Sequence, residues 1–233
     1  MPGKRLLRIV TLLAAGNPTD PPTSRLCDVC AEVSAMTGAG IMLMSENIPM
    51  GSVCTTDEVS SQIEDLQFML GEGPCVDAYR HGRPVLEPDL ADPETVRWMA
   101  FTPPVLMAGA RAVFGFPLQV GAVRLGALNL YRDRPGPLSD DQHADSLVIA
   151  DVAAHEILAM QGQTGIGAVA AEPDVGADFH LNVHQASGMV AAQLGITVGE
   201  ALVRIRAHVF SHDMTLSQVA GDIVARHLRF DTL

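Results

Sequence analysis

Residues 110–132 read ARAVFGFPLQVGAVRLGALNLYR, and this stretch decides the fold of the larger part of the chain. Two runs rich in strand-forming residues, 110–120 and 123–132, meet at Gly121 and Ala122. A short, glycine-containing connection between two such runs is typical of a tight turn between antiparallel strands. The sequence therefore predicts a long β-hairpin.

Shorter elements precede this hairpin, where helical periodicity alternates with strand-like runs. The residues Glu46-Asn47-Ile48-Pro49 favour a turn, which predicts a second hairpin around them. Tandem prolines at 103 and 104 must kink or restart any helix that contains them. The elements predicted here are a helix over 23–37, hairpin strands over 41–45 and 51–56, helices over 60–70 and 75–80, a strand over 85–88 and a mostly helical stretch over 93–107.

A domain boundary follows the long hairpin. Ser139 and Gln142 give an N-cap signature for a helix that runs to about residue 160. The next stretch, 159–177, reads AMQGQTGIGAVAAEPDVGA and lacks periodic large apolar residues. We therefore expect an α+β fold made of four parts. These are an N-terminal extension over 1–22, an antiparallel sheet flanked by helices over 23–161, a linker over 162–177 and an all-α module over 178–233.

Composition and charge distinguish the two ends of the chain. Of the 233 residues, 48% are hydrophobic and 18% are charged, which is typical of globular proteins. The net charge of −12 argues against indiscriminate attraction to nucleic acid, because phosphate affinity comes mainly from clustered lysines and arginines. Residues 178–233 carry only −1 of this charge and five of the eight histidines. The C-terminal part is therefore electrostatically distinct.

Nothing in the sequence predicts export or a membrane span. The N-terminus superficially resembles a signal peptide, but Arg8 interrupts an apolar run that is already short. The spacing of Leu6, Val10 and Leu13 predicts a short amphipathic helix instead. No stretch approaches the roughly 20 continuous apolar residues that cross a bilayer. We expect a cytoplasmic protein with no membrane contact.

The four cysteines, at 27, 30, 54 and 75, favour buried apolar thiols. Cys27 and Cys30 can share one helical turn, which leaves zinc binding or redox sensing open as alternatives. No second CxxC pair completes a zinc site, and no motif brings a histidine to Cys75. Phosphate loops and nucleophile elbows are also missing from the sequence. We therefore expect no metal site, no catalytic residue and no enzymatic activity, and the sequence names no cofactor.

Three short helices are predicted after the linker. The first covers 179–194 and ends at Gly195, Thr197 caps the second, and the third begins at 215 or 216. A three-helix module of this size has a small core, which favours a homodimer. We expect Phe210 to lie in that core or in the dimer interface rather than to stack on a base.

The second of these helices carries a basic stripe. Ala201 and Ile205 recur at the spacing of a buried face. Arg204, His208 and His212 lie at successive i, i+4 positions on another face. This pattern predicts a basic stripe along the helix.

Residues 185–224, QASGMVAAQLGITVGEALVRIRAHVFSHDMTLSQVAGDIV, resemble an ANTAR domain, the RNA-binding module of bacterial transcription antiterminators. The resemblance covers all three helices, and it implies recognition of paired hairpins in leader RNA, usually by a dimer. Many members carry a lysine where this chain has Ser187, so we expect a weaker phosphate contact there. The residues expected to contact RNA are Arg204, Arg206, His208, Arg226, Arg229, Ser187 and Gly188.

Two upstream segments, LGEGPCVDAYRHGRPVLEPDLADPETVRW at 70–98 and RAVFGFPLQVGAVRLGALNLYR at 111–132, resemble the GAF domain that precedes ANTAR in many actinobacterial proteins. The two resemblances together imply a signal-responsive transcription antitermination regulator, in which the GAF sensor controls dimerisation or exposure of the ANTAR module. A GAF core often encloses a small-molecule pocket, although the sequence names no ligand. Its expected lining here is Met42, Met44, Val53, Phe114, Phe116 and Leu128.

Two other functions stay open at this point. Three short helices can also present a recognition helix to the major groove, so a DNA-binding regulator is one alternative. The net charge of −1 over residues 178–233 supports the other, a ligand- or redox-dependent interaction module without nucleic-acid binding.

Overall fold

The structure is a computed structural model, and it describes residues 2–15, 22–45, 48–94, 97–164, 177–212 and 214–230. Contacts between Cα atoms divide the chain into two compact units. Met1–Ala170 is the N-terminal unit and Ala171–Leu233 is the C-terminal unit.

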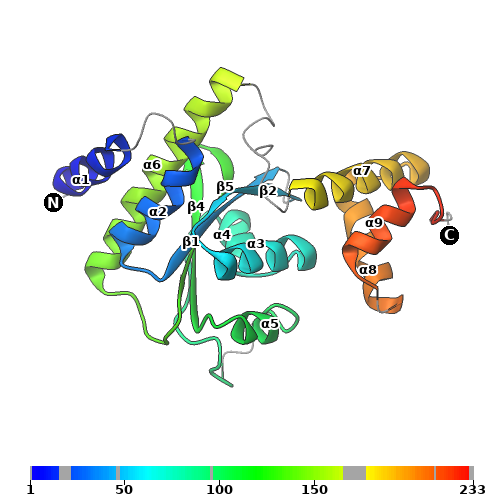
Figure 1. Cartoon of the computed structure of the whole chain (residues 1–233), viewed down its shortest axis with the longest axis horizontal. Coiled ribbons are helices and arrows are strands. Elements are labelled where there is room, and N and C mark those ends of the chain that lie inside the picture. The colour runs from blue at the N-terminus through cyan, green and yellow to red at the C-terminus, as the bar shows by residue number, and fades with distance from the viewer. Residues whose placement is uncertain are drawn as a thin grey trace. The chain divides into compact units, whose positions relative to one another are not determined.

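A five-stranded antiparallel sheet forms the centre of the N-terminal unit (Figure 1). The order across the sheet is β2-β1-β5-β4-β3. β4 and β5 pair from Ala112 opposite Arg132 to Val120 opposite Val123, which confirms the predicted long hairpin. β1 and β2 form the second predicted hairpin. The strand bounds are β1 Gly38–Ser45, β2 Ile48–Thr55, β3 Val85–Glu87, β4 Ala112–Val120 and β5 Val123–Arg132.

Helices cover both faces of this sheet (Figure 1). Helices α2 (Pro22–Ser34) and α6 (Asp140–Thr164) pack against one face, and α1 (Pro2–Ala14) packs against these two helices. Helices α3 (Glu58–Leu70) and α4 (Pro74–His81) pack against the other face, and α5 (Thr102–Met107) contacts α3. Successive side chains of a strand point to opposite faces, so Phe114 packs in the core beside α2 and α6 while Val113 packs with α3, α4 and α5. The predicted antiparallel sheet flanked by helices is confirmed.

The predicted helical stretch over 93–107 is only partly helical. Its described residues before α5 form turns and irregular structure. Trp98 has a φ of 53°, outside the helical region, and the Glu72 carboxylate accepts hydrogen bonds from the backbone N–H groups of Ala100 and Phe101, each at 2.9 Å. Bonds to a residue 28 positions away thus stabilise a loop, and the prediction is wrong over 97–101.

The C-terminal unit contains α7 (Ala177–Leu194), α8 (Val198–His212) and α9 (Leu216–Val224), as predicted. Gly195 ends α7 with a φ of 66°, which a residue with a side chain rarely adopts. Thr197 and Glu200 begin α8 by capping each other's backbone N–H. The buried side chains between the helices are Val183, Ala186, Val190, Ala201, Leu202, Ile205, Leu216, Val219, Ala220 and Ile223.

The predicted linker over 162–177 lies largely outside the described residues, which include Thr164 and Ala177 but not 165–176. Within the described parts of the chain, no single helix is long and apolar enough to cross a membrane. One strongly bent pair, Leu181–Leu194 with Val198–His212, meets the length and composition that a broken span requires.

Candidate functional site

Helix α8 presents the predicted basic stripe on the side away from the core of the C-terminal unit. Ala201 and Ile205 are fully buried, whereas Arg204 is exposed. His208 lies one turn beyond Arg204 and is half-buried. After one more turn, the His212 ring stacks on that of His208 with 3.9 Å between centroids and 18° between planes. The structure therefore brings the arginine and the two histidines into one row.

The surroundings of His208 disfavour a positive charge on its ring. Burial lowers the pKa of His208, and the neighbouring His212 lowers it further because two like charges in contact repel each other. His212 Nδ1 also lies 3.0 Å from the backbone oxygen of His208. The pair therefore offers aromatic ring faces beside Arg204 rather than two additional cations.

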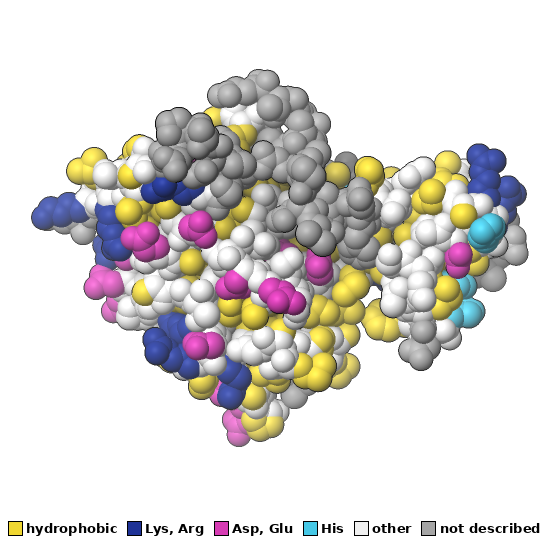
Figure 2. Space-filling view, in the orientation of Figure 1, with side chains coloured by type: hydrophobic (Ala, Val, Ile, Leu, Met, Phe, Trp, Pro, Cys, Tyr) yellow, Lys and Arg dark blue, Asp and Glu magenta, His cyan; other side chains and the backbone are white. Residues whose placement is uncertain are grey.

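The segment after α9 extends this surface to α7. Phe230 contacts the His208 ring edge-on, with 5.5 Å between centroids, and its backbone oxygen accepts a hydrogen bond from the Gln193 side chain of α7. Arg226 and Arg229 border a cavity of about 400 Å³ that Gln193 also lines. Figure 2 shows Lys or Arg side chains close to histidines on this unit. The other lining residues of the cavity are Met189, Ala192, Ile223 and Leu228.

We call Arg204, His208, His212, Arg226 and Arg229 the basic face. Phe230 connects its two halves, since it touches both His208 and the Gln193 side chain beside the cavity.

The remaining residues expected to contact RNA differ in their exposure. Ser187 is 1% exposed and its hydroxyl donates to the backbone oxygen of Val183 at 2.8 Å, so the structure removes it from the predicted surface. Gly188 is exposed, with open space where a side chain would be. Arg206 is half-buried, and two residues along a helix place it on the opposite side from Arg204. Phe210 is 63% exposed, which excludes it from the core of the C-terminal unit.

The residues expected to line a sensor pocket do not surround one cavity. All six are buried, but Val53, Phe114, Phe116 and Leu128 belong to the core beside α2 and α6. Met42 alternates with Ile41 and Leu43 of that core, so its side chain lies on the opposite face of β1. Met44 is also buried, close to the end of β1. The prediction combined residues from the two faces of the sheet.

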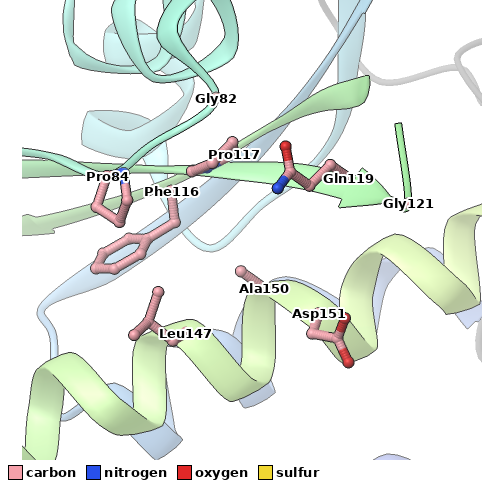
Figure 3. A pocket seen from close by; sticks show the side chains of 9 residues that line it. All are labelled: Gly82, Pro84, Phe116, Pro117, Gln119, Gly121, Leu147, Ala150 and Asp151. Atoms are coloured by element: carbon pink, nitrogen blue, oxygen red, sulfur yellow. The ribbon is translucent and has the colours of Figure 1, made fainter. Parts of the chain in front are cut away.

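A groove of about 350 Å³ lies between β4, the loop after α4 and helix α6 (Figure 3). Phe116 is the one expected pocket residue that lines it. Figure 3 shows Leu147 and Ala150 of α6 pointing toward the strand, below the Phe116 ring. Gln119 and Asp151 are its polar side chains, and the Asp151 side chain is 67% exposed. The groove is therefore mainly apolar and has no buried charged group among its lining residues.

A buried polar cluster lies on the other face of the sheet, and the sequence analysis missed it. Glu64 and Gln67 of α3, Asn129 of β5 and the Cys75 backbone N–H of α4 meet there. Cys75 N–H donates to Gln67 Oε1 at 2.7 Å. An asparagine within the apolar run of β5, and glycines opposite it at Gly40 and Gly115, were the available signals.

Cys30 and Cys75 are buried free thiols, as expected for all four cysteines, whereas Cys27 and Cys54 are paired. A disulfide joins Cys27 of α2 to Cys54 of β2, 27 residues apart in sequence, with 5.9 Å between Cα atoms. Cys30 and Cys75 are free and fully buried, and burial raises the pKa of each thiol. A high pKa disfavours the reactive thiolate. Over the described residues, no group of three or more His, Cys, Asp or Glu side chains is arranged to hold a metal ion.

The GAF domain family model matches residues 23–154, which is more than half of the chain, and this protein therefore belongs to the GAF domain family. Solved structures agree on the fold. The GAF domain of a phosphoenolpyruvate-protein phosphotransferase from Coxiella burnetii superposes with a TM-score of 0.53 at 14% identity, covering 71% of this chain and 97% of that chain. The GAF domain of the Acinetobacter phosphoenolpyruvate-protein phosphotransferase gives 0.51 at 14% identity with the same coverage. No curated protein gave a significant match.

Proposed function

We propose that this protein is a signal-responsive RNA-binding regulator of transcription antitermination, in which the GAF sensor domain controls an ANTAR-like C-terminal unit. The observation that carries the proposal is the basic face, where Phe230 and Gln193 link the stacked histidines beside Arg204 to the cavity that Arg226 and Arg229 border. The resemblance of residues 185–224 to ANTAR domains supports RNA as the partner.

The chemistry of the basic face suits RNA loops better than bulk phosphate. Single-stranded loops are recognised by stacking on aromatic and guanidinium planes as well as by phosphate contacts. The His208–His212 stack and the arginines supply both kinds of group without requiring a strongly basic unit. A net charge of −1 over residues 178–233 is compatible with this mode of binding, whereas long-range attraction to duplex phosphate needs more clustered cations.

Self-association is part of the proposal. Val203 and Phe210, seven residues apart on α8, are each 63% exposed and lie on one side of the helix. An apolar pair of this size on a small helical unit fits an interface with a second copy of the chain. The GAF domain would then control RNA binding by favouring or opposing that dimer.

The test is the affinity of the full chain for a leader RNA that contains two hairpins. We expect Arg204→Ala and Arg226→Ala each to weaken binding about tenfold at low salt, and to reduce the salt dependence by roughly one phosphate contact, since each loses one cation. Arg83→Ala is the matched control, because Arg83 is an exposed arginine of the N-terminal unit. Equal affinities for all four proteins would refute the assigned surface. A preference for duplex DNA over the hairpins in competition would favour a DNA-binding regulator instead.

A further inference from the structure

Helix α3 buries a carboxyl group against the middle of the sheet. Glu64 is 1% exposed, although its position on a helix that covers the sheet would allow an outward-facing side chain. The carboxyl group lies directly over Gly40 of β1, where a Cβ would approach Glu64 Oε1 to 2.6 Å. Only glycine leaves room for this contact, so the backbone of β1 is shaped to accept the Glu64 side chain.

The Asn129 amide favours the charged form of this carboxyl, but its effect is smaller than the opposing effect of burial. Neither carboxylate oxygen meets the geometry of a hydrogen bond, and Asn129 Oδ1 and Gln67 Nε2 beside it are also without partners. The titratable groups that act on Glu64 are Asp65 of α3 and Cys75 of α4, and the negative form of either one opposes ionisation of Glu64. A fully buried carboxylate without a partner is too costly to persist, so such a group holds its proton.

The pKa agrees with the geometry. Burial raises the pKa of Glu64 to about 8, with a smaller increase from Asp65 and a decrease from the nearby Asn129 amide. A carboxyl group with a pKa of about 8 is mostly protonated at pH 7 and loses its proton as the pH rises through 8.

The same cluster holds two helices on the sheet. Gln67, one turn beyond Glu64 on α3, accepts the Cys75 backbone N–H of α4 at 2.7 Å. Its side chain also lies against Gly73, where a Cβ would come within 2.6 Å of it. A charge at Glu64 would draw water into this contact region, because the carboxylate can be solvated only if α3 moves away from the sheet.

We propose that the buried cluster of Glu64, Gln67 and Asn129 is a proton-binding site, and that loss of the Glu64 proton to solvent loosens α3 and α4 from the sheet. The input of this sensor domain would then include the proton itself. This inference concerns the N-terminal unit alone and does not depend on RNA binding by the C-terminal unit.

The sign of the pH effect follows from linkage. The folded protein holds the Glu64 proton to a higher pH than the unfolded chain does, so Glu64 contributes stability that is present at low pH and is lost as pH rises toward 8. Where the folded form is protonated and the unfolded form is not, the unfolding equilibrium constant rises about tenfold per pH unit because of this one group.

Two measurements on the full chain test the proposal. The first follows the side-chain carboxyl carbons of the glutamates by ¹³C NMR as pH is raised, and it needs no variant. We expect one glutamate to titrate near pH 8, separate from the others. If every glutamate titrates at its ordinary value, the proposal is overturned.

The second measurement is urea unfolding followed by the fluorescence of Trp98, the single tryptophan, between pH 5.5 and 8.5. Glu64→Gln keeps the shape of the side chain without the titration, and it should flatten the pH dependence and raise stability at pH 8.5. Glu58→Gln, at an exposed site of the same helix, should leave the pH dependence unchanged. Identical pH dependence in wild type and Glu64→Gln, or a Glu64→Gln chain that is less stable at pH 8.5, would contradict the proposal.

Discussion

The two units of the chain place their large aromatic side chains in opposite ways. In the GAF domain, Phe68, Phe101, Phe114 and Phe116 are all fully buried between the sheet and its two helical layers. In the C-terminal unit, Phe210 of α8 is 63% exposed. The difference follows from architecture, because a sheet covered on both faces encloses large side chains, whereas three short helices enclose mainly Ala, Val, Ile and Leu. The GAF domain thus buries its large rings, whereas the C-terminal unit leaves Val203 and Phe210 exposed on α8.

The largest expected effect is a difference in stability when a phenylalanine is replaced by alanine in each of the two units. Phe114→Ala should lower the free energy of unfolding of the GAF domain by about 3–5 kcal/mol, since it removes a fully buried ring. Phe210→Ala should change the stability of the monomeric chain by no more than about 0.5 kcal/mol, because an exposed ring contributes little. Urea unfolding at low protein concentration measures both. Comparable losses for the two variants would show that Phe210 is packed within its own chain.

A smaller effect is expected when the disulfide of the GAF domain is reduced. Reduction of Cys27–Cys54 should lower the free energy of unfolding by about 3 kcal/mol, because it releases a closed loop of nearly thirty residues in the unfolded chain. Trp98 fluorescence during urea unfolding, with and without dithiothreitol, reports this change.

Two serine variants control that experiment. Cys27→Ser should abolish the response to reductant, whereas Cys30→Ser removes a buried free thiol and should retain it. Amide NMR signals from residues 198–212 should not shift on reduction. A response that disappears in Cys30→Ser would mean that Cys30 is a disulfide partner instead.

Local patterns were enough to predict most of the elements of the fold. The β4–β5 hairpin needs only two strand-forming runs and a short turn, and α7, α8 and α9 follow from apolar spacing with caps at Gly195, Thr197 and Thr215. These signals lie within a few residues of the structure they specify, so they can be read without knowing the fold.

Features that depend on distant contacts could not be predicted in this way. The loop at Trp98 is stabilised by Glu72, the disulfide joins a helix to a strand, and Glu64 of α3 is buried against Gly40 of β1. The six expected pocket residues come from both faces of the sheet for a related reason, since apolar character does not tell which face of a fully covered sheet a side chain occupies. Of the candidate surface, Arg204 and His208 followed from helical spacing, but the contacts of Phe230 with His208 and with the Gln193 side chain did not.

The most direct test of the proposed RNA-binding surface is ultraviolet crosslinking of the full chain to RNA in cells, with the crosslinked peptides identified by mass spectrometry and the RNA by sequencing. The expected result is a set of crosslinks within 198–212 and 225–230, on transcripts that carry paired hairpins in their leaders. Crosslinks confined to the GAF domain, or the absence of any RNA above the background of an Arg204→Ala, Arg226→Ala double variant, would contradict it.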